Sequence, residues 1–183
     1  MKKLTTEEMR RMSVEEFRKA EKLPLTVVLD NVRSLNNIGS VFRTADAFRV
    51  DHIALCGITA TPSHREIHKT ALGAEDSVAW SHHDDTAHYV RNLKDNGYRV
   101  FAVEIAHGSI KLGEEDARIA LQRAGEKVAV VFGNEIDGVA EEVMALCDAF
   151  IEIPQSGTKH SLNVSCAAAI VIWEIYKLIT HKT

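Results

Sequence analysis

Three short stretches of this chain concentrate side chains that could hold a polar ligand. The first, DNVRSLNNIG at 30–39, leads into a segment of helical spacing that carries Arg43. Backbone amides and an arginine near the start of a helix could bind a phosphate group. Asn37 could instead simply cap that helix, with Arg43 in solvent, and the residues alone leave both interpretations open.

The other two stretches follow apolar runs. FGNEIDG at 132–138 offers Gly133, where a backbone could approach a ligand, and the carboxylate of Glu135. The same letters also suit an ordinary turn. IPQSGTKHSLNVS at 153–165 is rich in hydrogen-bond donors and runs into the last helical segment. Such a loop suits a polar ligand among exposed backbone amides.

Competing motifs are weak. No GxGxxG, GxxxxGKS or GxxxxGKT pattern occurs, so the fingerprints of dinucleotide and P-loop phosphate binding are missing. HREIH at 64–68 lacks the HExxH order, which favours a solvated helix face over a zinc site. The sequence therefore predicts no metal site. The remaining candidate ligands, which have no CxxC or carboxylate pattern beside them, are Cys56, Cys147, Cys166, His82, His83 and His88.

The elements that must position these stretches follow from the hydrophobic pattern. Short runs of Val, Ile and Leu alternate with segments of helical period, which indicates a parallel sheet covered on both faces and an α/β fold. Ligands bind at the carboxyl edge of such a sheet, where all three polar stretches fall. The predicted strands are LTVVL 25–29, HIALC 52–56, SVAW 77–80, RVFAVEI 99–105, KVAVVF 127–132 and AFIEI 149–153.

The helices are predicted from their capping residues. Thr5 and Glu8 form a capping-box pattern that predicts a helix from about Thr6 to Ala20. Asn37 is expected to begin the second helix, and Asp84 or Asp85 another that Asn96-Gly97 closes. The last helix is expected from about Ser161 to Ile179. We expect residues 1–23 to be a helical extension and residues 24–183 to be one domain.

Composition limits the class of protein. The 183 residues carry 26 acidic and 22 basic side chains, for a net charge of −4. Because this balance is acidic, nucleic acid could bind only through a local basic patch, either the N-terminal helix or Arg33 with Arg43. The alternative is that this helix is a solvent-exposed surface with charges of both signs and binds no nucleic acid. No apolar run approaches the roughly 20 residues of a membrane span, and no secretory signal is present, so we expect a cytoplasmic protein that binds no membrane.

Together, the three stretches resemble the three motifs of the SpoU (TrmH-like) branch of the SPOUT RNA methyltransferases. The matching segments are NNIGSVFRTADAF at 36–48, VVFGNEIDGV at 130–139 and IPQSGTKHSLNVSCAAAI at 153–170, and the resemblance covers about residues 25–178. It implies an enzyme that transfers a methyl group from S-adenosylmethionine to a ribose 2′-hydroxyl of tRNA or rRNA. It also implies a C-terminal trefoil knot and a homodimer, with which the alanines at 167–169 are compatible.

The resemblance also implies which residues form the site. Arg43 is the centre of the implied mechanism, as a base aided by an RNA phosphate or as a clamp that orients the hydroxyl, and the sequence leaves both roles open. The implied catalytic residues are Arg43, Asn37, Glu135, Ser161 and Asn163. The implied cofactor-binding residues are Ala102, Val103, Glu104, Gly133, Ile153, Ser161 and Leu162.

Two alternatives from other classes remain open on the sequence. A non-catalytic RNA-binding protein of the same fold would explain the domain, although it would be free to lose the implied catalytic side chains. A nucleotide-binding regulator on an ordinary doubly wound sheet would need a phosphate loop, which the sequence lacks. Binding of S-adenosylmethionine would separate both alternatives from the enzyme.

Overall fold

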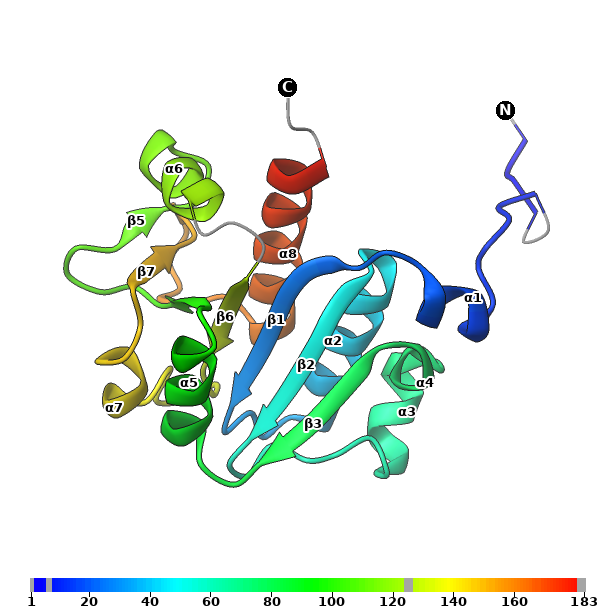
Figure 1. Ribbon diagram of the computed structural model, residues 1–183, viewed down its shortest axis with the longest axis horizontal. Helices are drawn as coiled ribbons and strands as arrows, with labels where there is room; N and C mark the ends of the chain where they lie inside the picture. Colours follow the sequence, from blue (N-terminus) through cyan, green and yellow to red (C-terminus); the bar gives the residue numbers. More distant parts are fainter. Residues whose placement is uncertain (1, 6–7, 124–126, 181–183) are drawn as a thin grey trace.

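A seven-stranded parallel sheet forms the centre of the computed structural model, which describes residues 2–5, 8–123 and 127–180 (Figure 1). The strand order is β3-β2-β1-β6-β4-β7-β5, and every neighbouring pair is parallel. The predicted α/β class is confirmed. The strands are β1 Leu23–Asp30, β2 Val50–Cys56, β3 Ala79–His83, β4 Arg99–Val103, β5 Ile110–Lys111, β6 Val128–Phe132 and β7 Ala149–Glu152.

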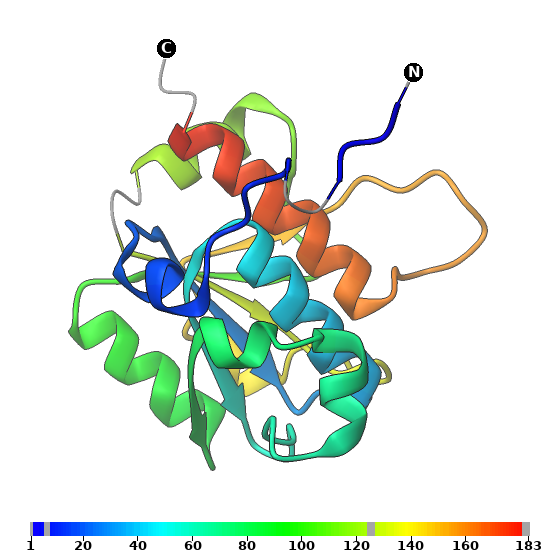
Figure 2. The same ribbon diagram turned by 90° about the vertical axis from the view of Figure 1, so that its right-hand side faces the viewer.

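Helices cover both faces of this sheet. α2 and α8 pack side by side over one face, together with α1, α3, α4 and α6, and bury the larger apolar cluster (Figure 2). α5 and α7 cover the other face with a second cluster that includes Val28 and Val131. The helices are α1 Val14–Lys19, α2 Leu35–Ala47, α3 Arg65–Ala71, α4 Ala74–Ser77, α5 Thr86–Asp95, α6 Glu115–Arg123, α7 Glu141–Met144 and α8 Val164–Thr180.

Each of the six predicted strands overlaps an observed strand, and β5 has no predicted counterpart. SVAW at 77–80 is wrong in part, because Ser77 ends α4 and β3 begins only at Ala79. β3 is an edge strand whose residues are all exposed or half-exposed, so its apolar pattern is weak. The predicted strand at 99–105 ends at Val103, although the Glu104 N–H still donates to the Ile151 carbonyl over 3.1 Å.

The first helix is shorter than predicted. Thr5 and Glu8 do exchange the two expected hydrogen bonds, but residues 8–10 form only a turn. The helix begins at Val14, because Ser13 and Glu16 form a second capping box there. The predicted start at Thr6 lies outside the described residues.

The caps of the other helices show one further error. Ser34, not Asn37, caps α2, since its hydroxyl accepts from the Asn37 N–H over 3.3 Å and leaves the Asn37 side chain free for other contacts. Asp85 caps α5 and Asn96 ends it, as predicted. α8 begins at Val164, close to the predicted position.

The connection between β4 and β5 crosses β7. Val103 at the end of β4 and Ile110 at the start of β5 flank the same residue of β7, Ile151. The linking residues 104–109 therefore pass from one side of β7 to the other, and the Ser109 hydroxyl donates to Glu152 over 2.7 Å. Because β4 and β7 are paired in parallel, their ends lie together at the carboxyl edge of the sheet. Among the described residues, no helix has the length and apolar character needed to cross a membrane.

Candidate functional site

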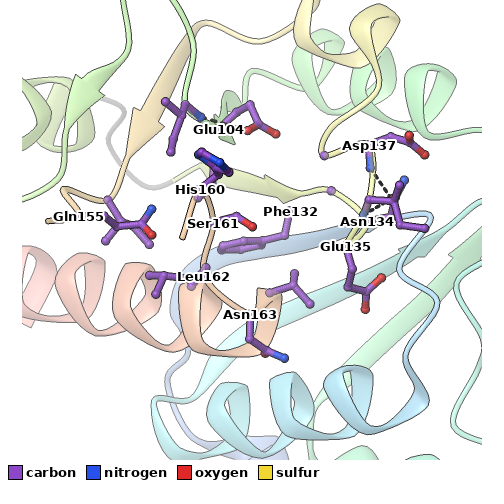
Figure 3. Close-up of a pocket in the computed structure, with 18 of the residues that line it drawn as sticks. Glu104, Phe132, Asn134, Glu135, Asp137, Gln155, His160, Ser161, Leu162 and Asn163 are labelled. Atoms are coloured by element: carbon purple, nitrogen blue, oxygen red, sulfur yellow. Dashed lines mark hydrogen bonds between the residues drawn. The ribbon is translucent and has the colours of Figure 1, made fainter. Parts of the chain in front are cut away.

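A cavity of about 530 Å³ opens at the carboxyl ends of β4, β6 and β7 (Figure 3). Three chain segments line it: 103–105 after β4, 132–138 after β6, and 151–167 around the loop between β7 and α8. Two of these segments are the second and third polar stretches of the sequence. The implied cofactor residues that line the cavity are Val103, Glu104, Gly133, Ile153, Ser161 and Leu162.

Ala102 is the exception among those residues. It is fully buried inside β4, where it pairs with Val131 and Phe150, and it does not line the cavity. His160 and Asn134 line the cavity although sequence reasoning did not select them. Asn134 belongs to the second polar stretch and His160 to the third. Which residues of a loop face a cavity depends on the path of the loop, and the sequence does not give that path.

One amide joins the three polar stretches. The Asn37 side chain, which is 8% exposed, donates from Nδ2 to Glu135 Oε1 over 2.9 Å. Its Oδ1 accepts from Asn163 Nδ2 over 3.0 Å. Asn163 in turn accepts from the N–H and hydroxyl of Ser165 in the first turn of α8. Pairs of side chains 98 and 126 residues apart in the sequence thus form one network beside the cavity.

The environment of Glu135 favours its ionised form. Its carboxylate accepts from the backbone N–H groups of Arg33 and Ser34, each over 3.3 Å, near the N-terminus of α2. Partial burial alone would raise the pKa of Glu135, but the hydrogen bonds from the Asn37 side chain and from backbone N–H groups outweigh burial and lower it. Glu135 therefore acts as a fixed anion that holds the loop before α2.

The loop after β6 is held by its own backbone and by Glu104. Asn134 and Gly138 exchange two backbone hydrogen bonds, and Asn134 Oδ1 accepts from the N–H groups of Ile136 and Asp137, each over 2.8 Å. Glu104 Oε2 accepts from the Val139 N–H over 3.2 Å. A Cβ on Gly133 would lie 1.9 Å from the Gly138 carbonyl carbon, so only glycine permits this close turn.

The Asp30 carboxylate holds neighbouring segments of the site by hydrogen bonds. The sequence pattern did not single out Asp30 for this role. It is 1% exposed at the end of β1, where Oδ1 accepts from the Thr86 hydroxyl over 2.6 Å and from Asn31 Nδ2 over 2.8 Å. Its Oδ2 accepts from the Ala140 N–H over 3.1 Å, which fixes the far end of the 133–140 segment. A carboxylate that ends a largely apolar strand was the available signal.

Arg43 lies outside this cluster. It is exposed on α2, nearly two turns beyond Asn37, and lines a separate groove between α2, α3 and α8. The structure thus brings Asn37, Glu135 and Asn163 together, places Ser161 in the cavity wall, and leaves Arg43 outside the cavity. Among the described residues, no group of three or more His, Cys, Asp or Glu side chains could hold a metal ion.

The third stretch forms a long loop that projects from the body of the protein between β7 and α8 (Figure 2). Leu162 is 38% exposed there, on the cavity side. Phe132 and Leu162 form an apolar part of the cavity wall, and Glu104 and Asp137 contribute carboxylates to it (Figure 3). The cavity can therefore hold a ligand with both an apolar ring and a positive group.

Comparison with known proteins identifies the family. The model of the SpoU rRNA Methylase family matches residues 24–173. A tRNA (guanosine(18)-2′-O)-methyltransferase from Thermus thermophilus is 34% identical over 91% of this chain and 81% of its own length. A putative TrmH family tRNA/rRNA methyltransferase from Staphylococcus saprophyticus is 31% identical over 86% of this chain. The match covers only 60% of that relative's length.

A solved structure agrees with these relatives. The AdoMet-bound rRNA methyltransferase from Sinorhizobium meliloti superposes with a TM-score of 0.75 at 27% identity, over 88% of this chain and 59% of that one. The region matched by the family model contains all three polar stretches and the sheet that positions them. This chain therefore belongs to the SpoU rRNA methylase family.

Proposed function

We propose that the protein transfers a methyl group from S-adenosylmethionine to a ribose 2′-hydroxyl of tRNA or rRNA. The observation that carries this proposal is the network of Asn163, Asn37 and Glu135, which joins the three family motifs beside one cavity. The Thermus relative is named for 2′-O-methylation of tRNA, and the Sinorhizobium structure holds AdoMet. These findings favour the same reaction and cofactor here.

The residues of the cavity fit such a cofactor. S-adenosylmethionine supplies an activated methyl group on a sulfonium, together with an adenine ring and a ribose. Val103, Ile153 and Leu162 would provide apolar contact for the ring, with exposed backbone groups of the loops around it. The carboxylate of Glu104 at the cavity wall suits a positive ligand.

The chain's own contribution would be to place the acceptor hydroxyl against the methyl group, whose transfer would leave S-adenosylhomocysteine and release the hydroxyl proton to solvent. Because a guanidinium is a poor base at neutral pH, we assign Arg43 to bind an RNA phosphate and orient the 2′-hydroxyl. Asn37, Glu135 and Asn163 would hold the start of the Arg43 helix against the cavity. Ser161 would contact ligand from the cavity wall.

The test is transfer of labelled methyl groups. Incubation with labelled S-adenosylmethionine and total RNA is expected to label ribose, which nucleoside analysis after digestion separates from base labelling. Label on bases alone would reject the reaction. Cofactor binding in calorimetry without any labelling of RNA would favour the non-catalytic RNA-binding alternative.

We also propose that the chain forms a trefoil knot. β7 lies between β4 and β5, which residues 104–109 already connect, so the chain enters a space that an earlier loop encloses. Stretching single molecules from their ends tests this proposal. A knotted chain is expected to stop short of the full length of 183 residues at about 3.6 Å each, whereas an unknotted chain reaches it.

A homodimer through α8 completes the proposal. Two of the alanines do not provide its surface, because Ala168 is fully buried and Ala167 is 9% exposed. The exposed face of α8 instead carries Ile170 and Trp173, which are 41% and 45% exposed and lie one turn apart. Sedimentation is expected to give about twice 20.3 kDa, and Ile170→Glu is expected to give the monomer mass. A wild-type monomer would contradict the dimer.

A further inference from the structure

A shallow groove of about 490 Å³ lies between α2, α3 and the middle of α8. Its walls carry two cations, Arg43 and Lys69, and hydroxyls of Ser40, Thr44 and Thr70. No acidic side chain of the described residues lines the groove, although the chain as a whole has a charge of −4. The acidic residue of α2, Asp46, does not line the groove. The groove is therefore a local positive surface on an acidic protein.

α2 and α3 pack at backbone distance, which brings the helix positions of Arg43 and Lys69 to the same groove. A Cβ on Gly39 would lie 2.0 Å from the Thr70 hydroxyl and 2.4 Å from the Ile67 carbonyl oxygen. The Thr70 hydroxyl donates across this contact to the Asn36 carbonyl over 3.1 Å. This close contact brings Lys69 to the same groove as Arg43, which no spacing in the sequence revealed.

The groove lies on the same helix as part of the active-site network, although it shares no lining residue with the cavity. Asn37 of the active-site network stands at the start of α2, and Arg43 follows about 9 Å further along the helix axis at 1.5 Å per residue. Asn36, Ser40 and Arg43 lie at helical spacing on one side of α2. An RNA strand whose ribose lies at the cavity would follow α2 to reach the groove.

We propose that this groove binds the phosphate backbone of the RNA substrate, with Lys69 as a second phosphate contact beside Arg43. The inference rests on the proposed function and names a capture surface for its substrate. Lys69 now contacts Glu66 over 2.7 Å, and the two side chains are 55% and 44% exposed. Such an exposed pair contributes little, so a phosphate can replace Glu66 as the partner of Lys69.

The experiment measures binding of bulk tRNA over a range of salt concentrations. Lys69→Ala is expected to weaken binding and to lower the slope of log affinity against log salt by about one unit, the loss for one phosphate contact. Lys69→Arg is expected to keep the slope. Glu66→Gln is expected to strengthen binding, because it removes the competing carboxylate. Lys111→Ala, on β5 at the opposite edge of the sheet, is the matched control and is expected to match wild type.

Each outcome decides a separate question. A wild-type slope in folded Lys69→Ala, in a protein that methylates RNA, would overturn the groove and leave the proposed function standing. A lowered slope in a protein that transfers no methyl group would support the groove as an RNA surface and reject the enzyme. An equal loss of slope in Lys111→Ala would mean that charge alone, rather than this groove, captures RNA. S-adenosylmethionine affinity is expected to be unchanged in Lys69→Ala, because Lys69 does not line the cavity.

Discussion

The Asn37 side chain uses both halves of its amide, donating to Glu135 and accepting from Asn163. An aspartate has the same shape but no donor, so Asn37→Asp would place a buried carboxylate against the exposed carboxylate of Glu135. We expect this variant to lose about 1–3 kcal/mol of unfolding free energy and most methyl transfer. Asn36→Asp, at the exposed neighbouring position, is the control for stability, and an equal loss of unfolding free energy in both variants would reject the network.

Glu135 gives the network a dependence on pH. Because its pKa is lowered in the folded protein from an ordinary value of 4.5, its ionised form stabilises the fold above that value. This stabilisation is lost as the pH falls through the lowered pKa. Urea unfolding from pH 7 to pH 3 is expected to show a stability gap between wild type and Glu135→Gln that narrows toward acid. A gap that widens would contradict the assignment, and Glu142→Gln controls for the loss of an exposed carboxylate.

Arg43 is exposed and outside the cavity, so its role is separable from cofactor binding. Arg43→Ala is expected to abolish nearly all turnover at saturating S-adenosylmethionine while leaving cofactor affinity unchanged in calorimetry. Arg43→Lys keeps the charge without the planar fork and is expected to recover only part of the activity. Collapsed cofactor affinity with surviving turnover would show that the division of the site is wrong.

At the scale of elements, the turn after β6 depends on the contact between Gly133 and Gly138. The sequence alone suggests that a side chain at Gly133 would enter ligand space. The structure shows that a Cβ there would instead meet the turn's own backbone, within 2.1 Å of the Val139 nitrogen. A side chain at Gly133 would therefore strain the loop first, and it would affect ligand binding because the loop lines the cavity.

Gly133→Ala is accordingly expected to lower thermal stability, by about 1–3 kcal/mol at the melting temperature, and cofactor affinity together. Gly157→Ala is the matched control, because a Cβ there would meet nothing within 4 Å and the residue belongs to the projecting loop. Calorimetry and thermal melts on both variants check this. Full stability with lost affinity would instead favour a side chain that enters ligand space.

Elements with strong periodicity were predictable, and those with weak signals were not. Apolar runs located β1, β2 and β6, and Asp85 with Asn96 bounded α5, because these signals are local. The sequence could not show that Asn37 meets Glu135, since that contact depends on strand order. The short α4 and β5 were not predicted, and β3 was predicted only in part, because short or half-exposed elements carry too few apolar residues to set a pattern.

For the whole molecule, the N-terminal segment is partly core and partly surface. Phe17 is 5% exposed within the main core, and Arg18 donates to the Asp76 carbonyl over 2.7 Å. Removing residues 1–20 would therefore damage the fold, whereas removing residues 1–12 takes away Arg10 and Arg11 and spares α1. The shorter deletion is the one that isolates RNA capture.

Deletion of residues 1–12 is expected to weaken binding of bulk tRNA and to lower its salt slope, while cofactor affinity stays unchanged. Filter binding at several salt concentrations and calorimetry check the two parts. An unchanged slope would make this segment a solvated surface and leave RNA capture to the α2–α3 groove.

The position of β7 between β4 and β5 has a consequence for synthesis on the ribosome. Within the described sheet β5 pairs only with β7, which begins 38 residues after Lys111. At about 5–20 residues per second, the nascent chain carries an unpaired β5 for about 2–8 seconds. The half built on β1, β2 and β3 can form meanwhile, but the cavity cannot exist until the C-terminal segment has emerged. A chain stalled before residue 149 would therefore be partly folded and without methyltransferase activity, and chaperones would be expected to bind it.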